Sequence, residues 1–400
     1  MKRILVNAYA CEPFKGSEQG VGWNFVLQLA KDYQVDVITR SNNRSVIEAN
    51  LPRELKNNLH FHYYDTHPFI LKFKRKANGL YLYYFFWQIG VFRLARKLSK
   101  GAKFDYSFQP TMGSMWMPTF FPFLNISFIW GPLGGGEGVP KSFLNILPVK
   151  DRIIQSFRYS LKYLVYINPL LFYSLYKSKI LLIRTENSLD FIPKKFRYKT
   201  HLILETAIES DVFKYSKERR ENDCIHLIIT GRLVPFKNVI SVIHSLKLLP
   251  NDFNFKLDII GSGPEKKRIK QAIDTHKLKT SVNFIDELQR EEVLRKLCKA
   301  DIYLFPSLRE GGSWALMEAM AVGLPVICLN WTGNAVIIDE KSAIGLEVTN
   351  PQQFIIDFAD SIMKLANNRQ YRIDIGRQAR IRIKEKFSWL TKVSEFKKLL

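Results

Sequence analysis

The chain has 400 residues, with 60 Lys and Arg against 37 Asp and Glu, which gives a formal net charge of +23. That length exceeds what one hydrophobic core usually serves, and the 46% hydrophobic and 13% aromatic content excludes a disordered chain. The four cysteines form no C-x-x-C pair, which excludes a disulfide framework and a zinc ribbon and suits a reducing compartment.

Neither a secretory signal nor a membrane-spanning segment is predicted. After the basic start only residues 4–6 are apolar, and no window reaches roughly 18–20 uninterrupted apolar residues. The excess positive charge therefore predicts a surface that meets an anionic membrane, a nucleic acid or a polyanionic small ligand.

The first half of the chain alternates strands and helices. Residues 2–10 are typical of a buried strand, the stretch 16–22 of a glycine loop, residues 23–31 of a helix and residues 35–39 of a second strand. This order predicts a βαβ unit with a parallel sheet. Further strands are expected at 60–64, 105–108, 126–130, 180–184 and 201–204.

A second alternation follows the charged stretch 214–223, which is the best candidate for a linker. Strands are expected at 224–230, 255–260, 282–285, 302–305 and 325–329, and helices at 239–249, 264–277, 290–299, 312–322 and from 351 onwards. We therefore expect an α/β protein with two facing, doubly wound, Rossmann-like domains, 1–213 and 224–385. A helix at 386–400 would pack back on the first domain. Ligands should bind in the cleft between the domains, beyond the carboxyl ends of the strands.

Two segments, 69–100 and 152–179, mix apolar, aromatic and basic residues. They suit amphipathic helices lying on an anionic membrane, with Lys74, Arg75 and Lys76 among the basic residues. The alternative is a pair of aromatic core helices whose Lys and Arg side chains extend to the surface.

The stretch from Gly231 and Arg232 to Lys237 opens a helix directly after a buried strand. A helix start offers free backbone N–H groups and the positive end of a dipole. With one guanidinium and one ammonium added, it could hold a diphosphate. The alternative is a basic surface turn.

A second motif contains two carboxylates, Glu310 and Glu318, with Gly311 and Gly312 just after the first. The glycines allow close backbone approach, and an eight-residue step on a helix is a little over two turns, so both carboxylates can face one side. Carboxylates beside a phosphate site suit hydrogen bonds from sugar hydroxyls. Taken alone, Glu318 could be a solvated helix residue.

Together these motifs, with Gly261-Ser-Gly263-Pro264 and the following Ala319, Gly323 and Pro325, resemble the retaining nucleotide-sugar glycosyltransferases of GT-B fold, the large family 4. Residues 9–23 and 130–137 are similar to a branch that builds bacterial exopolysaccharides and lipopolysaccharides. The resemblance implies a metal-independent hexosyltransferase acting on a glycan or lipid-linked acceptor, at the inner face of the plasma membrane. Domain 1–213 would face the acceptor and domain 224–385 would bind the nucleotide sugar.

The resemblance also implies roles for single residues. Arg232 and Lys237 would hold the donor diphosphate, Glu310 the sugar hydroxyls and Glu318 the ribose. The backbone at the start of the next helix would close on the phosphates, Leu288 would lie near the base, and Gly20 would approach the donor from the other domain. The closing backbone comprises Gly312, Ser313, Trp314 and Ala315.

One departure from the family concerns a first-domain His that many relatives carry near the donor sugar. Residues 106–111 contain none, so either Gln109 or Thr111 substitutes for it, or the contact is dispensable, or the enzyme is weak or inactive. Gly135 and Glu137 are further candidates on the acceptor side. A catalytically silent binding or scaffold subunit of a polysaccharide assembly complex is the alternative.

Other ligand classes match the sequence poorly. There is no D-x-D triplet for a metal–diphosphate site, so neither a metal nor a cofactor is expected. Nucleic acid is not an expected partner, because the basic residues alternate with apolar aromatics and no recognised binding motif is present.

Overall fold

The computed structural model describes residues 1–73, 79–218 and 224–400. The chain forms two compact units, and it crosses between them more than once. Unit 1 contains residues 1–136, 160–206 and 392–400, and unit 2 contains residues 137–159 and 207–391.

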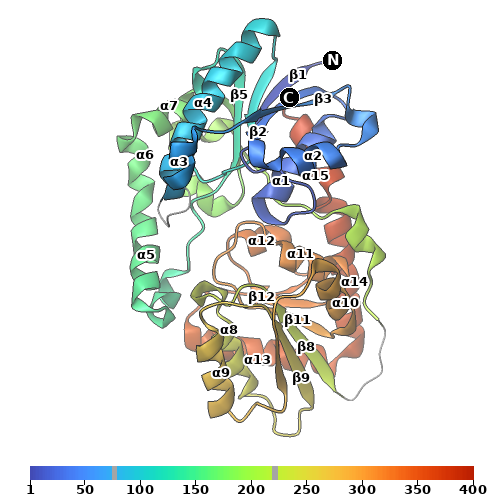
Figure 1. Ribbon diagram of the computed structural model, residues 1–400. Helices are drawn as coiled ribbons and strands as arrows, with labels where there is room; N and C mark the ends of the chain where they lie inside the picture. The colour runs from blue at the N-terminus through green and yellow to red at the C-terminus, as the bar shows by residue number, and fades with distance from the viewer. Residues whose placement is uncertain (74–78, 219–223) are drawn as a thin grey trace. The chain divides into compact units, whose positions relative to one another are not determined.

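Unit 1 is built on a parallel sheet with the strand order β3-β2-β1-β4-β5-β6-β7. Helices α1 and α15 cover one face and α4 and α7 the other (Figure 1). The strands are β1 Arg3–Asn7, β2 Gln34–Arg40, β3 Leu59–Tyr64, β4 Tyr106–Gln109, β5 Ser127–Leu133, β6 Ser178–Ile183 and β7 Thr200–Leu202. The helices are α1 Ser17–Leu29, α2 Arg44–Asn50, α3 Pro68–Phe73, α4 Gly79–Gly101, α6 Leu164–Ile167, α7 Pro169–Lys177 and α15 Trp389–Lys397.

Unit 2 is built on a second parallel sheet, with the order β10-β9-β8-β11-β12-β13. Helices α8, α9 and α13 pack on one face of this sheet, and α10, α11 and α14 lie on the other. The strands are β8 Ile225–Thr230, β9 Phe255–Ile260, β10 Val282–Ile285, β11 Ile302–Phe305, β12 Val326–Leu329 and β13 Ile344–Leu346. The helices are α5 Val149–Ser160, α8 Val239–Leu246, α9 Lys266–Thr275, α10 Arg290–Lys299, α11 Trp314–Ala321, α12 Gly333–Ile337, α13 Pro351–Asn367 and α14 Arg369–Lys386.

Both sheets have the buried, nearly continuous apolar strands that parallel sheets require. In β11 and β12 every residue is buried, and so are the last four residues of β1. The expected α/β architecture with two Rossmann-like units is thus confirmed for the described part of the chain.

The first glycine stretch differs from its predicted loop. Helix α1 begins at Ser17, so Gly20 and Gly22 lie inside it. At Gly22 a Cβ atom would come 2.0 Å from the carbonyl oxygen of Ala10. Because that contact leaves no room for a side chain, glycine serves close helix–loop approach here and not a turn.

The division of the chain also differs from the expected boundaries. Residues 137–159 form part of unit 2, and the crossing to unit 2 comes at residue 207, before the predicted linker 214–223. In that stretch the N–H groups of Lys217 and Glu218 donate to the carbonyls of Val322 and Cys298 at 2.8 Å, which ties residues 217–218 to unit 2. The rest of the predicted linker, residues 219–223, lies outside the described residues.

Candidate functional site

In unit 2 the strand order reverses between β8 and β11, because β9 and β10 continue on one side and β12 and β13 on the other. In open parallel sheets such a reversal leaves a crevice at the carboxyl ends of the two strands, and ligands bind there. The loops that start at Gly231, after β8, and at Pro306, after β11, both begin at this point.

The loop after β8 brings both predicted cations to the crevice. Arg232 and Lys237 line a small hollow together with Thr230, Phe305 and residues 306–307. The Lys237 ammonium lies 5.0 Å from the centre of the Phe305 ring and pairs with Glu310. No described residue pairs with the guanidinium of Arg232, which is exposed. The hollow is therefore positive on one side and has an ion pair on the other.

Close contacts between two glycine loops hold this backbone in place. Gly261 has a φ of +139°, and a Cβ there would come 2.1 Å from the carbonyl oxygen of Gly231. At Gly263 a Cβ would come 2.3 Å from the carbonyl oxygen of Leu233, whose N–H donates to Ser262 at 2.7 Å. The absence of side chains at Gly261 and Gly263 thus lets this segment pack directly against the backbone of the loop after β8, since any side chain there would push that loop away.

Glu310 lies in the loop before α11 and not on the helix itself, because α11 begins only at Trp314. This corrects the expectation that both carboxylates share one helix face. A different contact fixes Glu310: its N–H donates to the hydroxyl of Thr332 at 3.2 Å, and its carbonyl accepts from Gly333 at 3.1 Å. Thr332 has a left-handed φ of +50°, a strained conformation of the kind that concentrates at functional sites.

Glu318 is buried in α11, with 9% of the residue exposed, so it is not the solvated helix residue of the alternative interpretation. Arg290 at the start of α10 donates to its carboxylate at 2.7 Å and to Glu209 at 2.5 Å. Burial raises the pKa of Glu318, and the Arg290 charge opposes that rise. The carboxylate is therefore held in place by one guanidinium.

Tyr303 of β11 is a buried phenol whose pKa responds to the charges of both carboxylates. Its hydroxyl hydrogen-bonds Thr230 at 2.8 Å, at the end of β8. Burial raises the pKa of Tyr303, and although the bond to Thr230 opposes this, the charges of Glu318 and Glu310 add to the rise. Both carboxylates thus lie within electrostatic range of one buried phenol. The structure brings Lys237, Glu310 and Glu318 to the same end of the sheet.

The start of α11 supplies hydrogen-bond donors to this region. Ser313 is the N-cap, and its hydroxyl accepts from the N–H of Leu316 at 3.4 Å. The first N–H groups of a helix have no intrahelical partner. The indole N–H of Trp314 is buried and has no hydrogen-bond partner among the described residues. Gly312 and Ala315, the remaining predicted residues of this segment, are half-buried.

Leu288 lies half-buried between β10 and α10, in a loop that other residues hold. Asp286 pairs with Lys266 at 2.5 Å, and Glu287 accepts from the Ser262 hydroxyl at 2.5 Å. The Leu288 loop is therefore tied to the glycine loop that supports Gly231. Its predicted contact with a base stays a prediction.

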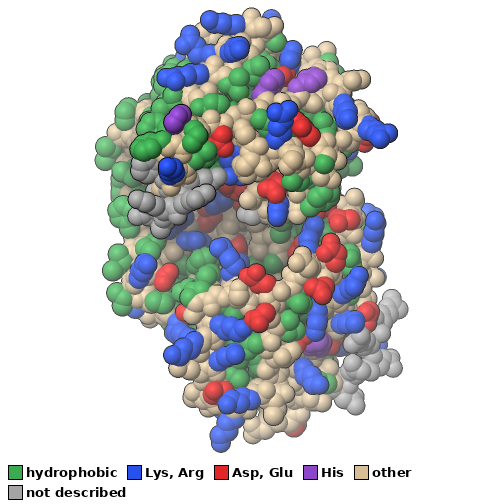
Figure 2. Space-filling model, viewed as in Figure 1, with side chains coloured by type: hydrophobic (Ala, Val, Ile, Leu, Met, Phe, Trp, Pro, Cys, Tyr) green, Lys and Arg blue, Asp and Glu red, His purple; other side chains and the backbone are tan. Residues whose placement is uncertain are grey.

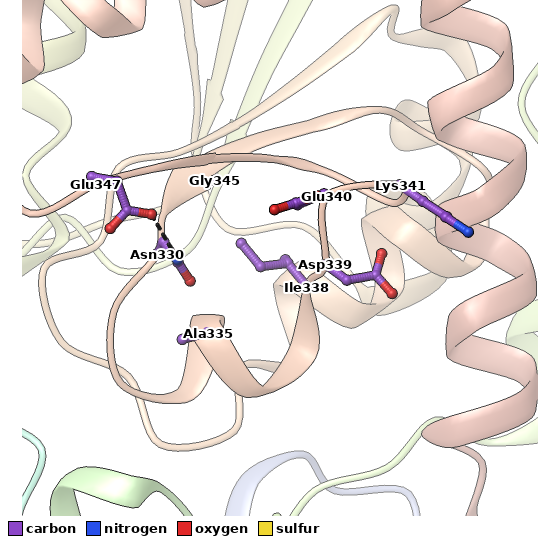
Figure 3. A pocket seen from close by; sticks show the side chains of 8 residues that line it. All are labelled: Asn330, Ala335, Ile338, Asp339, Glu340, Lys341, Gly345 and Glu347. Atoms are coloured by element: carbon purple, nitrogen blue, oxygen red, sulfur yellow. Dashed lines mark hydrogen bonds between the residues drawn. The ribbon is translucent and has the colours of Figure 1, made fainter.

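A second hollow, of about 680 Å³, opens further along the same sheet edge, beyond β12 and β13 (Figure 3). Asn330 donates to Glu347 across it at 2.9 Å, and Asp339, Glu340 and Lys341 also line it. Three carboxylates against one lysine make this hollow a poor site for a diphosphate. The charge of unit 2 therefore favours the crevice at β8 and β11.

The predicted residues of the first half lie elsewhere. Gln109 and Thr111 are buried in unit 1, where Gln109 accepts from Asn7 at 3.1 Å and donates to Tyr84 at 3.3 Å. Gly20 is buried in α1. The predicted acceptor-side pair falls in different units, since Gly135 belongs to unit 1 and the buried Glu137 to unit 2. Their predicted roles stay predictions.

Sequence reasoning missed the residues that hold the site together, Arg290, Tyr303, Thr332 and Gly333. Arg290 is only the first residue of a charged helix in the sequence, and Tyr303 is one aromatic in an apolar strand. The sequence offered one local signal, the glycine at position 333. The structure explains it, since a Cβ there would come 1.3 Å from the carbonyl oxygen of Gly311.

The comparisons with known proteins concern this same part of the chain. Residues 212–382 match the family model Glycosyl transferases group 1. An uncharacterised glycosyltransferase of Methanocaldococcus jannaschii is 30% identical over 190 residues, 46% of this chain and 47% of that protein. The capsular polysaccharide biosynthesis glycosyltransferase CapM of Staphylococcus aureus is 30% identical over 182 residues, 44% of this chain and 45% of CapM. The chain thus spans about half the length of the curated relatives it matches.

Solved structures extend the likeness to the fold of the whole chain. HepE of Anabaena, solved with UDP and glucose, aligns with a TM-score of 0.62 at 14% identity, covering 100% of this chain and 99% of HepE. A glycosyltransferase of Rickettsia africae aligns with the same TM-score and identity, over 100% of this chain and 97% of that one. The family model and the relatives support the group 1 glycosyltransferases as the family of residues 212–382, and the solved structures support the GT-B type of fold.

Proposed function

We propose that the protein is a retaining glycosyltransferase that moves a hexose from a nucleotide sugar to a lipid-linked glycan during the synthesis of a cell-surface polysaccharide. The observation that carries the proposal is the meeting of Arg232, Lys237 and Glu310 at the point where the strand order of unit 2 reverses. This crevice lies in the segment that matches the group 1 family.

In this proposal Arg232 and Lys237 bind the diphosphate of the donor. Their positive charges stabilise the negative charge that grows on the leaving diphosphate, and losing one such group typically costs roughly 10²–10³ in rate. The N–H groups from Gly312 to Ala315 close on the phosphates. No metal is needed for this step, and the leaving phosphate helps to take the acceptor proton.

The carboxylates orient the sugars. Glu318 accepts from the ribose hydroxyls while Arg290 holds it, and Glu310 accepts from the hexose after the diphosphate has drawn Lys237 away. Leu288 contacts the base. Exclusion of water from the site suppresses hydrolysis of the donor. Because the leaving phosphate takes the acceptor proton, no hydrolase-type carboxylate pair is required.

The relatives support the choice of acceptor and of the first donor to test. CapM acts in capsular polysaccharide biosynthesis, and a 27% identical relative of Erwinia amylovora acts in amylovoran biosynthesis. HepE was solved with UDP-glucose as well as with UDP and glucose. UDP-glucose is therefore the first donor to test, and GDP- and TDP-sugars follow.

The test measures binding of these nucleotide sugars by calorimetry and transfer to a lipid-linked acceptor. We expect one donor to bind and Glu310→Ala to abolish transfer, while Lys247→Ala, at an exposed lysine after α8, leaves both unchanged. Failure of every nucleotide sugar to bind would contradict the proposal. Binding without turnover would favour the silent scaffold subunit, an alternative consistent with Gln109 being engaged by Asn7 and Tyr84.

We further propose that the protein acts at the inner face of the plasma membrane, and α5 supplies the main support. Its apolar residues Val149, Ile153, Ile154 and Phe157 follow helical spacing but are 47–68% exposed. The other side of the helix is polar. Arg158 donates to the carbonyl of residue 137 and Gln155 is buried, while Arg152, although exposed, donates to the carbonyls of residues 144 and 145.

A helix whose polar side faces the protein and whose apolar side faces outward suits the boundary of a lipid bilayer. Among the described residues no helix is long and apolar enough to span a membrane. Unit 1 has its own apolar surface, which Figure 2 shows over the edge that carries α6 and α7. Tyr166 and Ile167 are 69% and 73% exposed there. The basic residues 74–76 of the other amphipathic segment lie outside the described residues.

Vesicle flotation tests the membrane proposal directly. Ile153→Glu combined with Phe157→Glu should release the protein from vesicles of anionic phospholipid, because it places two charges in the apolar stripe. Ile381→Glu, at a 41% exposed isoleucine of α14, is the control and should bind like the wild type. Equal flotation of all three proteins would refute a role for α5.

A further inference from the structure

Unit 1 contains an apolar hollow of about 260 Å³ away from its predicted polar residues. Its walls come from α4, α7, strand β5 and the loop that follows β4. The main contributors are Phe85, Met115, Trp116, Met117, Trp130 and Leu171. Methionines adapt to ligands of irregular shape, so this lining suits a flexible occupant.

The polar side chains at the walls are already bonded within the protein. Asn168 accepts from the N–H groups of Leu170 and Leu171 at 3.1 Å, and Ser174 donates to the carbonyl of Leu170 at 2.8 Å. Thr119 accepts from the N–H of residue 121 at 3.3 Å. The lining of the hollow is therefore mainly hydrocarbon, and its polar side chains already have partners within the protein.

One donor is the exception. The indole N–H of Trp116 is buried and has no partner among the described residues. A Cβ at residue 135 would come 2.9 Å from that nitrogen, so Gly135 makes room for the indole. This nitrogen lies against Gly135, so its N–H is not a contact that an occupant of the hollow needs to reach.

The hollow opens toward an apolar surface. Phe85 lines it and is also 38% exposed, and its neighbours Tyr81, Leu82 and Phe86 on α4 are 39–66% exposed. A hydrocarbon chain leaving a bilayer could pass from this surface into the hollow without crossing water. The net charge of +23 favours an anionic lipid over a neutral one.

We propose that this hollow binds the hydrocarbon chain of an anionic lipid. This inference rests on the proposed function, in which the acceptor is lipid-linked, and it assigns the acceptor's chain to unit 1. The chain is an isoprenoid or an acyl chain, which share the chemistry that the hollow recognises. Each methylene that enters should tighten binding up to about fourfold, until the hollow is full.

The test titrates the full chain by calorimetry with farnesyl phosphate and with dodecyl phosphate, each below its micelle concentration. Leu170→Trp fills the hollow from a half-buried position on α7, and Tyr176→Trp adds the same side chain at an exposed site of that helix. We expect Leu170→Trp to weaken chain binding at least tenfold and Tyr176→Trp to leave it unchanged. Phe85→Trp, which narrows the opening from α4, is a second variant should Leu170→Trp fold poorly.

The outcomes separate the sources of the chain and the two proposals. Tighter binding of farnesyl phosphate supports an isoprenoid lipid, and tighter binding of dodecyl phosphate supports an acyl lipid. If neither binds, or if both filled variants bind like the wild type, the inference is overturned even where a nucleotide sugar binds. If chain binding is lost in Leu170→Trp while no nucleotide sugar binds the wild type, the lipid site stands and the proposed transferase fails.

Discussion

Removing the ammonium of Lys237 should weaken nucleotide binding more than the loss of one contact would, because Glu310 remains. Both side chains are largely buried, with 16% and 12% exposed, and they pair with each other. A hydrogen bond to a charged group contributes roughly 1.5–3 kcal/mol. In Lys237→Met the Glu310 carboxylate is also left uncompensated, and at about 5 Å and an effective dielectric of 20 it repels each unit charge of a diphosphate by up to roughly 3 kcal/mol.

Because the Glu310 carboxylate can turn toward solvent, we expect Lys237→Met to lose about 2–4 kcal/mol of the free energy of UDP binding, which is roughly a 30- to 1,000-fold loss in affinity. The assay is calorimetric titration with UDP at about 0.1 M salt, where surface charges are screened. Lys237→Met combined with Glu310→Gln should bind UDP at least fivefold more tightly than Lys237→Met alone, because the repulsion is gone. Lys247→Met is the control. A single variant that binds like this control, or a double variant no better than the single one, would refute the reasoning.

Three further substitutions test unit 2. Glu318→Gln should change the free energy of unfolding in guanidinium chloride by less than about 1 kcal/mol, because burial raises the pKa of Glu318 and Arg290 keeps Glu209 as its partner; a larger loss would show that the pair stabilises the fold. Gly261→Ala, at a φ of +139°, should lower the melting temperature by several degrees and weaken UDP binding at least tenfold, because its Cβ displaces the loop after β8; an unchanged melting curve would count against that contact. The hydrogen bond from His226 lowers the pKa of Asp258 from 3.8 to about 2. The ionised carboxylate therefore adds to the free energy of unfolding above about pH 4, and this contribution is lost as the pH falls toward 2. Asp258→Asn should lower the free energy of unfolding by about 1 kcal/mol at pH 7, and its melting temperature should fall less than that of the wild type as the pH is lowered from about 4 to about 2. An unchanged dependence of the melting temperature on pH would exclude a stabilising His226–Asp258 pair.

The fold was predictable because its signals are local. Buried parallel strands are apolar along their whole length, so β8, β11 and β12 stand out in the sequence, and the loop from Gly231 to Lys237 follows directly from the end of β8. The two cations could be found for the same reason, since a strand end, a glycine and a helix start are adjacent in the chain.

What the sequence did not reveal depends on distant contacts. Arg290 reaches Glu318 across 28 residues, and Thr332 fixes the Glu310 backbone across 22. Nothing in the pattern around either residue marks it as a partner of a carboxylate. The excursion of residues 137–159 into unit 2 likewise has no local signature, because amphipathic helices look alike whichever core or surface they serve.

Arg290 and Glu318 form a costly pair, and its cost bears on the proposed function. Burying an ion pair rarely stabilises a protein relative to an apolar pair of the same size, so a largely buried carboxylate that already has a guanidinium partner is better explained by positioning than by stability. Glu310 differs, because its partner Lys237 lines the same hollow as Arg232, for which no partner lies within residues 1–73, 79–218 and 224–400. An arriving diphosphate would meet Arg232 first and then compete with Glu310 for Lys237. From this order we infer that the Lys237–Glu310 pair selects against monoanions, since only a ligand with two adjacent charges can engage Arg232 and still replace the carboxylate at Lys237.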